Sequence, residues 1–221
     1  MNSNMYNWID KTYNPLAGEC SHKCSYCWVN NLKKRSPEIM KKYSGEPRLD
    51  KNTLKKKVPR GTHFLCSCND LFADVQDNII MEILRWANNQ DCQWVIQTKD
   101  PYRMLNYIPW LPKNCIVGTT IETNRDVTHI SKGIHPETRA KCISMVDRER
   151  FLTIEPIMSF DLELFLELIK LAKPNWVNVG CDSKNNHLPE PSAAEVQLLI
   201  EGIKKLGIEI RKKVNLERLD N

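Results

Sequence analysis

The sequence predicts an α/β fold in which parallel strands alternate with helices, closed or partly closed as a barrel. After residue 60, short segments rich in Val, Ile, Trp and Phe alternate about six times with amphipathic segments. Such alternation is typical of parallel strands joined by crossover helices. No linker or internal repeat divides the 221 residues. We therefore expect one domain over residues 1–221.

The elements are expected in the following order. Residues 6–9 (YNWI) are a first strand candidate. A helical stretch runs from Cys27 toward Tyr43 and is interrupted at Ser36-Pro37, because serine caps a helix and proline opens one. Residues 44–60 form a basic surface connection. Further strands are expected at 62–67, 92–98, 115–121, 151–155, 175–181 and 208–214, and helices at 77–88, after Asp100-Pro101, at 136–145, 161–172 and 192–206, before a polar tail at 215–221.

The composition is that of an ordinary soluble protein, with 41% hydrophobic and 27% charged residues. The N-terminal residues show no basic-then-apolar signal segment, and no apolar run approaches the ~18 residues of a membrane span. We therefore expect a cytoplasmic protein with no membrane partner. In that compartment the nine cysteines stay reduced and available to a metal.

The net charge of +5 is unevenly placed along the chain. Residues 33–60 hold eleven Lys or Arg against Glu38, Glu46 and Asp50, a local surplus of +8. A basic segment of this kind attracts a phosphate-bearing substrate or an acidic electron-donor protein. The alternative is a solvated, lysine-rich helix surface.

Three cysteines lie within eight residues, with the spacing C-x3-C-x2-C at Cys20, Cys24 and Cys27. A structural zinc site uses four ligands, and a disulfide uses two. An iron–sulfur cube held by three protein thiolates leaves one iron free for another ligand. The competing interpretations are three core cysteines on one helix face, a zinc site completed by His22, and a disulfide framework.

Polar residues follow most of the predicted strands. In a (β/α) barrel, the chemistry gathers at the carboxyl ends of the strands. Loops often begin with polar residues because these residues cap the next helix, so any one of them alone is weak evidence for a site. Together they predict a polar, metal-containing pocket at one rim. These residues are Cys66-Ser67-Cys68-Asn69-Asp70, Thr98-Lys99-Asp100, Thr119-Thr120-Ile121-Glu122, Glu155 and Cys181-Asp182.

The cysteine spacing, with the aromatic Tyr26 before the last thiol, resembles the cluster loop of radical S-adenosylmethionine (SAM) enzymes. The resemblance implies a partial (β/α)6 TIM barrel and a [4Fe–4S] cluster on Cys20, Cys24 and Cys27. It also implies that SAM is cleaved reductively to methionine and a 5′-deoxyadenosyl radical, which abstracts hydrogen from a substrate. An electron donor such as flavodoxin or ferredoxin is then the implied partner.

The same resemblance suggests roles for the strand-end residues. Asn69 and Asp70 are expected to receive the methionyl amino group, although the family's usual Gly-Gly-Glu is absent there. Lys99 suits the methionyl carboxylate, because an ammonium offers a point charge and three donors. Thr119 or Glu122 is expected at the ribose hydroxyls.

Glu155, at the end of the next strand, completes the predicted cofactor-binding set. Cys68 is the expected hydrogen-atom donor or catalytic thiol, whereas Cys66 and Cys181 remain candidates for catalysis, a second cluster or burial. The other cysteines read as small core residues, namely Cys92, Cys115 and Cys142.

A closer resemblance covers roughly residues 8–190. The segments YNPLAGEC, CNDLFAD, VIQTKDPYRM, VGTTIETNRD, LTIEPI and WVNVGCDS are similar to a small, phage-associated subgroup of radical-SAM-like proteins. That subgroup's chemistry is unsettled, so it implies fold and cofactor but no substrate. Thr98-Lys99 is also similar to the corresponding segment of spore photoproduct lyase, at the level of one motif.

We therefore expect a radical SAM enzyme acting on an unknown substrate, with a nucleotide or nucleic acid suggested by residues 33–60. Two alternatives remain open. One is a zinc-bearing nucleic-acid-binding module built on Cys20, His22, Cys24 and Cys27. The other is a non-catalytic iron–sulfur protein.

Overall fold

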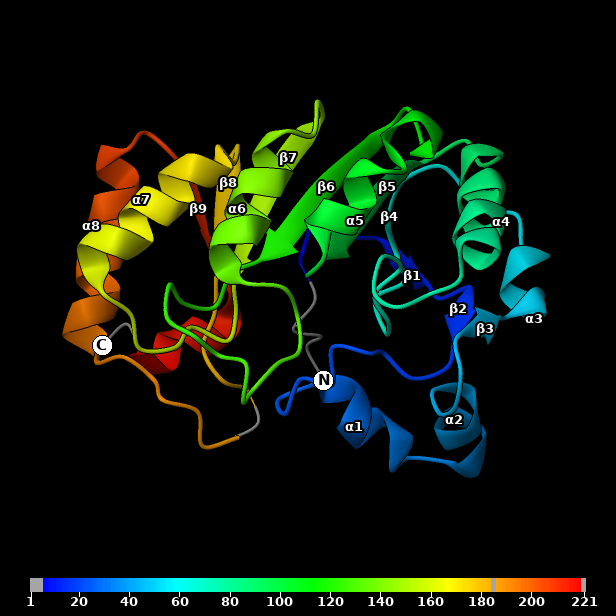
Figure 1. Ribbon diagram of the computed structural model, residues 1–221, viewed down its shortest axis with the longest axis horizontal. Coiled ribbons are helices and arrows are strands. Elements are labelled where there is room, and N and C mark those ends of the chain that lie inside the picture. Colours follow the sequence, from blue (N-terminus) through cyan, green and yellow to red (C-terminus); the bar gives the residue numbers. More distant parts are fainter. Residues whose placement is uncertain (1–5, 184–185, 220–221) are drawn as a thin grey trace.

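The computed structural model describes residues 6–183 and 186–219, and its centre is a seven-stranded sheet (Figure 1). Every neighbouring pair in the sheet is parallel. The two outermost strands are sheet edges, so the described part of the chain forms a partial barrel, as predicted. In sheet order the strands are β1 (Lys11–Tyr13), β4 (Thr62–Leu65), β5 (Gln93–Thr98), β6 (Cys115–Thr120), β7 (Glu149–Ile154), β8 (Trp176–Val179) and β9 (Glu209–Lys212).

Five helices follow strands of this sheet, and they lie on its outer side in Figure 1. Apolar residues of all five helices and of β4–β8 form the main hydrophobic core. Its strand contributions include Leu65, Ile96, Val117, Leu152 and Val177, all nearly inaccessible to solvent. The five helices are α4 (Asp77–Asn88), α5 (Pro101–Leu105), α6 (Pro136–Ser144), α7 (Leu162–Ala172) and α8 (Ala193–Lys205).

The helix boundaries follow the capping residues in the sequence. Ser192 and Glu195 form a capping box at the start of α8. Asp100 accepts a hydrogen bond from the backbone N–H of Arg103 at the start of α5. Ser36 caps α2 (Pro37–Lys42), which separates it from α1 (Trp28–Lys33) at the predicted interruption. The boundaries predicted for these helices lie within three residues of those observed, and for α5 the prediction covered its start alone.

The concave face of the sheet carries an aromatic cluster near its amino end. Phe64, Val95, Ile116, Phe151 and Trp176 come from five successive strands and pack against the N-terminal segment. The rings of Phe151 and Trp176 stack with centroids 5.5 Å apart. This cluster fills the inside of the partial barrel, so the interior is packed at that end.

The expected strand at residues 6–9 is wrong. The backbone turns there, with the N–H of Ile9 donating to the carbonyl of Tyr6 at 3.1 Å. The turn lets the rings of Tyr6 and Trp8 stack on each other, 5.4 Å apart, while Trp8 meets Trp176 edge-on. Aromatic packing inside the barrel therefore outweighs the strand propensity of this segment, and β1 begins only at Lys11.

Two segments expected to be irregular contain short elements. The connection 44–60 contributes β3 (Arg48–Leu49), which pairs antiparallel with β2 (Leu16–Ala17), and α3 (Lys51–Leu54). The expected polar tail begins inside a 3-10 helix, Val214–Leu219, whose Leu216 is buried in the core. The last two residues of that tail lie outside the described residues.

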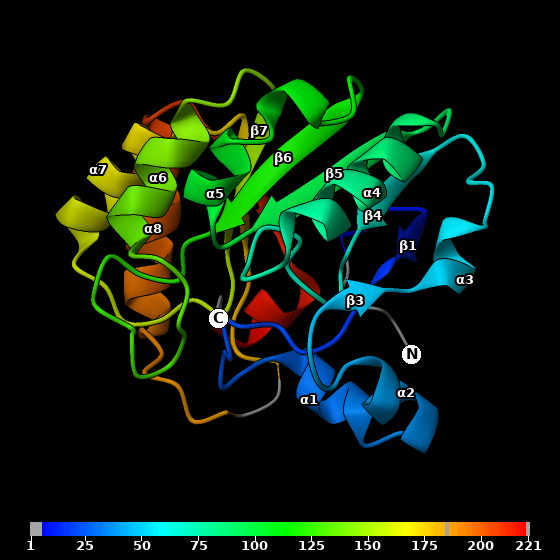
Figure 2. The ribbon, with the colours of Figure 1, turned by 45° about the vertical axis from the view of Figure 1, so that its right-hand side comes forward.

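The parallel sheet places the carboxyl ends of all its strands along one edge. Figures 1 and 2 show α1, α2 and the preceding loop below that edge, on the side to which the β6 arrow points. Within residues 6–183 and 186–219, we find no helix of the length and apolar character needed to span a bilayer.

The aromatic cluster depends on a glycine in β6. A methyl group on Gly118 would lie 2.3 Å from the ring of Phe151. We expect Gly118→Ala to lower the free energy of unfolding by about 1–3 kcal/mol, the usual cost of overpacking. Urea denaturation measures this effect. Phe151→Leu should relieve part of the clash in the double variant, and purely additive effects of the two substitutions would contradict the contact.

Candidate functional site

The three predicted cluster ligands lie on one loop, between β2 and α1, at the carboxyl edge of the sheet. Cys20, Cys24 and Cys27 are each half-buried. The loop turns tightly at Lys23, whose φ of 44° is left-handed, and Cys27 N–H donates to the carbonyl of Cys24 at 3.1 Å. Burial raises the pKa of Cys20 to about 12, with a contribution from the nearby charge of Asp70.

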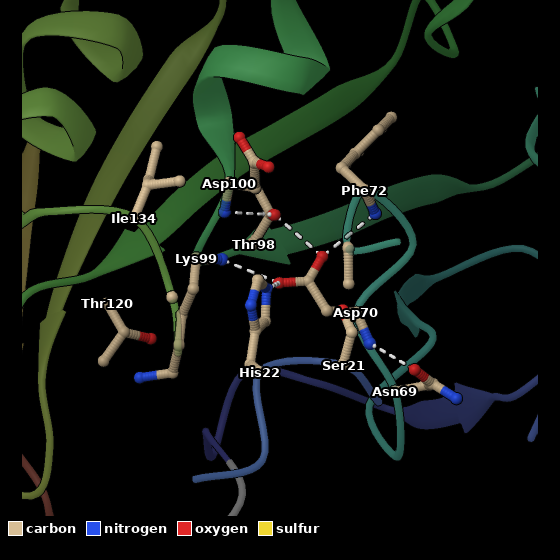
Figure 3. Close-up of polar contacts among 12 residues, drawn as sticks. Ser21, His22, Asn69, Asp70, Phe72, Thr98, Lys99, Asp100, Thr120 and Ile134 are labelled. Carbon is tan, nitrogen blue, oxygen red and sulfur yellow. Dashed lines mark hydrogen bonds and ion pairs between the residues drawn. The ribbon is translucent and has the colours of Figure 1, made fainter. Parts of the chain in front are cut away.

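Asp70 fixes one side of this cluster loop. Its Oδ2 pairs with Nε2 of His22 at 2.8 Å and accepts from the backbone N–H of Lys99 at 2.7 Å. Its Oδ1 accepts from the hydroxyl of Thr98 at 2.7 Å and from the N–H of Phe72 at 3.0 Å (Figure 3). Burial raises the pKa of Asp70, but the charge and hydrogen bond of His22, together with the other donors, outweigh it and lower the pKa.

A second buried network holds the aromatic residue of the loop. The Tyr26 hydroxyl donates to Oε1 of Glu122, and the ammonium of Lys99 contacts both the same oxygen and the Tyr26 hydroxyl. Arg139, from α6, donates to Oε2 of Glu122 at 2.9 Å. Both Glu122 and Arg139 are fully buried. Burial raises the pKa of Glu122, but Lys99 and Arg139 outweigh it and lower the pKa to about 2.

The loop after β6 contacts a third side of the cluster loop, and the sequence did not predict this contact. Ser131 Oγ lies 3.2 Å from Sγ of Cys24. Ser25 N–H donates to the carbonyl of Ile130 at 2.9 Å, and Lys132 N–H donates to that of His22 at 2.7 Å. These contacts join residues more than one hundred positions apart. No local sequence signal marks them.

Asn69 also holds the cluster loop in this structure. Its side-chain amide donates to the carbonyl of Gly18 at 3.0 Å, while its Oδ1 accepts from the N–H of Asp70 at 2.9 Å. The predicted role of Asn69 and Asp70 at the methionyl amino group stays a prediction. The geometry places both residues as supports of the loop, since their polar atoms are already bonded to the protein.

The predicted ribose partners are not exposed to a ligand. Thr119 is fully buried, and its hydroxyl donates to the carbonyl of Thr98 at 2.7 Å. Thr120, one residue later, is on the other face of β6 and accepts from the amide of Gln97 at 2.6 Å. Because side chains alternate across a strand, Thr120 is the threonine on the concave face. The alternation of side chains along a strand could have predicted that Thr120, and not Thr119, is on the concave face.

Glu155 lies in a separate polar group near the end of β7. Its carboxylate pairs with Lys213 at 2.5 Å and accepts from the amide of Asn215 at 2.9 Å. Lys213 comes from the segment expected to be the last strand, and Asn215 comes from the segment expected to be a tail. A methyl group on Gly180 would lie 2.7 Å from Asn215 and 3.0 Å from Glu155, so this glycine permits the close approach.

The remaining cysteines lie outside the loop, and one of them, Cys68, belongs to an apolar cluster against which Cys27 packs. Cys68 packs with Val29 and Tyr43 under α1 and α2, and burial raises its pKa. Cys66 belongs to the main core, and Cys181 donates to the carbonyl of Asn215. Cys68 as the catalytic thiol stays a prediction. The three cysteines predicted to lie in the core are buried or half-buried, namely Cys92, Cys115 and Cys142.

The donor set fits an iron–sulfur cluster with three protein ligands. Three half-buried thiols share one loop, and Cys24 interacts electrostatically with both Cys20 and Cys27. His22, the fourth ligand of the zinc alternative, instead directs its Nε2 to Asp70. Within the described ranges, no three His, Cys, Asp or Glu side chains converge on one point suited to a single ion.

A family model with the description "Protein of unknown function (DUF5131)" matches residues 3–195. The chain belongs to this family. The comparison with curated proteins gives no match.

Solved structures with a similar fold are radical SAM enzymes. A mutant of spore photoproduct lyase has a TM-score of 0.59 at 12% identity, over 91% of this chain and 76% of that one. Another, with bound AdoMet and dinucleoside spore photoproduct, has a TM-score of 0.51 at 14% identity, over 87% and 61%. SuiB of Streptococcus suis, bound to S-adenosylmethionine, has a TM-score of 0.56 at 13% identity. It covers 91% of this chain, which spans less than half (46%) of SuiB. These likenesses show that the chain has the radical SAM fold.

The buried Glu122 network yields a prediction about stability and pH. Glu122→Gln leaves Arg139 and Lys99 without a counter-charge, which costs about 3–5 kcal/mol at a buried pair. Since the pKa of Glu122 is about 2 in the folded protein and 4.5 ordinarily, its stabilisation is complete above pH 4.5 and is lost as the pH falls toward 2.

Urea unfolding across that pH range should show the wild type and Glu122→Gln converging in acid. The matched control is Glu163→Gln in the first turn of α7, where the side chain is exposed. Equal stability of Glu122→Gln and wild type at neutral pH would show that the network does not stabilise the fold.

Proposed function

We propose that the protein is a radical SAM enzyme that holds a [4Fe–4S] cluster on Cys20, Cys24 and Cys27. The observation that supports this most directly is the position of the three thiols. They lie on one fixed loop at the carboxyl edge of a partial barrel whose fold is that of radical SAM enzymes. When bound, the reduced cluster would supply the electron that splits SAM into methionine and a hydrogen-abstracting 5′-deoxyadenosyl radical.

The protein's own residues would position the cofactors and exclude water. Asp70 and Glu122 hold the loop from two sides through His22 and Tyr26. Lys99 would leave Glu122 and contact the methionyl carboxylate, since its side chain keeps 14% exposure whereas those of Glu122 and Arg139 are fully buried. Arg139 would keep the charge of Glu122 balanced during that exchange, because it pairs with the other oxygen.

The electron donor and the surroundings follow from this proposal. A flavodoxin or ferredoxin would reduce the cluster, and the reducing cytoplasm would keep the thiols free. The phage association of the similar subgroup stays a prediction. The zinc alternative would have to use Nδ1 of His22, because Nε2 is bonded to Asp70, and analysis of the protein for zinc and iron tests it. A non-catalytic iron–sulfur protein is separated from an enzyme by measuring SAM cleavage.

Anaerobic reconstitution with iron and sulfide, followed by SAM and dithionite, tests the proposal. We expect a brown protein that forms 5′-deoxyadenosine. Cys24→Ala should lose the full cluster and this activity, because each thiolate holds a different iron. The control is Cys92→Ala, which should keep the optical spectrum. Full cluster content and SAM cleavage in Cys24→Ala would refute the assignment, and a cluster without cleavage in the wild type would favour the non-catalytic protein.

Lys99→Ala should weaken SAM binding while iron content stays unchanged. A charge-assisted hydrogen bond is worth about 1.5–3 kcal/mol, so the dissociation constant should rise about 10- to 100-fold. Equilibrium binding of SAM to the reconstituted protein gives this value. The control is Lys113→Ala, an exposed lysine just before β6. Unchanged SAM affinity in Lys99→Ala would place the methionyl carboxylate elsewhere.

A further inference from the structure

The positive surplus of residues 33–60 remains largely uncompensated in the folded protein. Three of its cations have carboxylate partners: Lys33 with Glu19, Lys42 with Asp50, and Arg60 with Asp91. Arg48 donates to backbone carbonyls. The others are exposed and make no ion pair within the described ranges, namely Lys34, Arg35, Lys41, Lys51, Lys55, Lys56 and Lys57.

A concave site lies beside these charges, at the free edge of β1. It has a volume of about 530 Å³, and its walls carry three lysines and three neutral polar side chains. That volume lies within the range of about 300–1,000 Å³ found for ligand sites. We call it the β1 cavity. Its polar lining includes Lys11, Lys42, Lys56, Thr12, Thr53 and Asn14.

The β1 cavity has the chemistry of an anion site. No acidic side chain lines it among the described residues. Asp50 is close enough to bond both Lys42 and Thr53, so that lysine is neutralised. Lys11 and Lys56 are exposed and have no carboxylate partner in the part of the chain that the structure describes. Two free ammonium groups beside hydroxyl and amide donors suit a phosphate group.

The cavity is directly connected to the candidate site. Asn14, in its wall, accepts from the N–H of Cys68 at 2.9 Å and from the hydroxyl of Ser67 at 3.3 Å. The next two residues, Asn69 and Asp70, hold the cluster loop. A ligand with a phosphate in the cavity would therefore lie one loop away from the loop that carries the thiols.

We propose that the β1 cavity binds a backbone phosphate of a nucleic-acid substrate, and that Lys51, Lys55 and Lys57 extend this contact along the strand. A concave site with several donors suits a single phosphate group, whereas an acidic protein would contact the exposed lysines around it. Lys51, Lys55 and Lys57, which lie outside the cavity, suit a ligand with repeating negative charges. That the bound nucleic acid is the substrate rests on the proposed function, whereas its binding does not.

Fluorescence anisotropy with a labelled single-stranded oligonucleotide and the reconstituted protein tests this proposal. The test variant is Lys11→Ala/Lys56→Ala. The control is Lys141→Ala/Lys204→Ala, which removes two exposed lysines from α6 and α8 on the helical side of the sheet. Both variants lower the net charge by the same amount. Formation of 5′-deoxyadenosine is measured on the same samples, so that a failure of binding and a failure of SAM cleavage are told apart.

We expect the test variant to bind about tenfold or more weakly at about 50 mM salt, with the control unchanged. Each neutralised phosphate of a single strand contributes about −0.7 to the slope of log affinity against log salt, so losing the phosphate in the cavity should flatten the slope by about 0.7. Equal losses in both variants would overturn the proposal, since only net charge would then matter. Absent oligonucleotide binding, with a flavodoxin that binds the wild type and not the test variant, would assign the surface to the electron donor instead.

Discussion

The candidate site depends on one buried carboxylate. Asp70 accepts from four groups that belong to three segments: the cluster loop, its own loop after β4, and the end of β5. A buried charge is tolerated only when it is paired and fully hydrogen-bonded, so each of these donors is needed where it is. Asp70 thereby fixes His22, which lies between Cys20 and Cys24 in the sequence, relative to the ends of β4 and β5.

The second network works by the same principle one strand further along. Glu122 at the end of β6 binds Tyr26 of the loop, Lys99 of the β5 end and Arg139 of α6. Lys99 links the two carboxylates, because its backbone N–H donates to Asp70 and its ammonium contacts Glu122. A ligand that draws this ammonium away leaves the Asp70 contact intact. The loop can therefore keep its position while the Glu122 network changes its charge pairing.

The fold was predictable because its elements are long or strongly patterned. The apolar periodicity of residues 77–88 and the caps Ser36, Asp100 and Ser192 act locally, and the structure retains them. The strand-end rule also brought Asp70, Lys99 and Glu122 to one edge. It did not give their directions: Thr119 and Thr120 are both buried, and a one-residue step along β6 places Thr120, but not Thr119, on the concave face. The turn at residues 6–9 and the contact of Ser131 with Cys24 depend on tertiary packing that no local pattern encodes.

The hydrophobic core of the protein does not include the loop that carries the three thiols. Small metal domains often fold only with their metal, because the ligands supply most of the stabilising contacts. Here the main core is built from β4–β8 and the outer helices, and none of the three loop thiols belongs to it. The loop itself is fixed by hydrogen bonds to Asp70, Glu122 and residues 130–131. A substitution at one thiol would therefore act on the proposed cluster and leave the sheet in place, so the iron content of such a variant would report on ligation rather than on global unfolding.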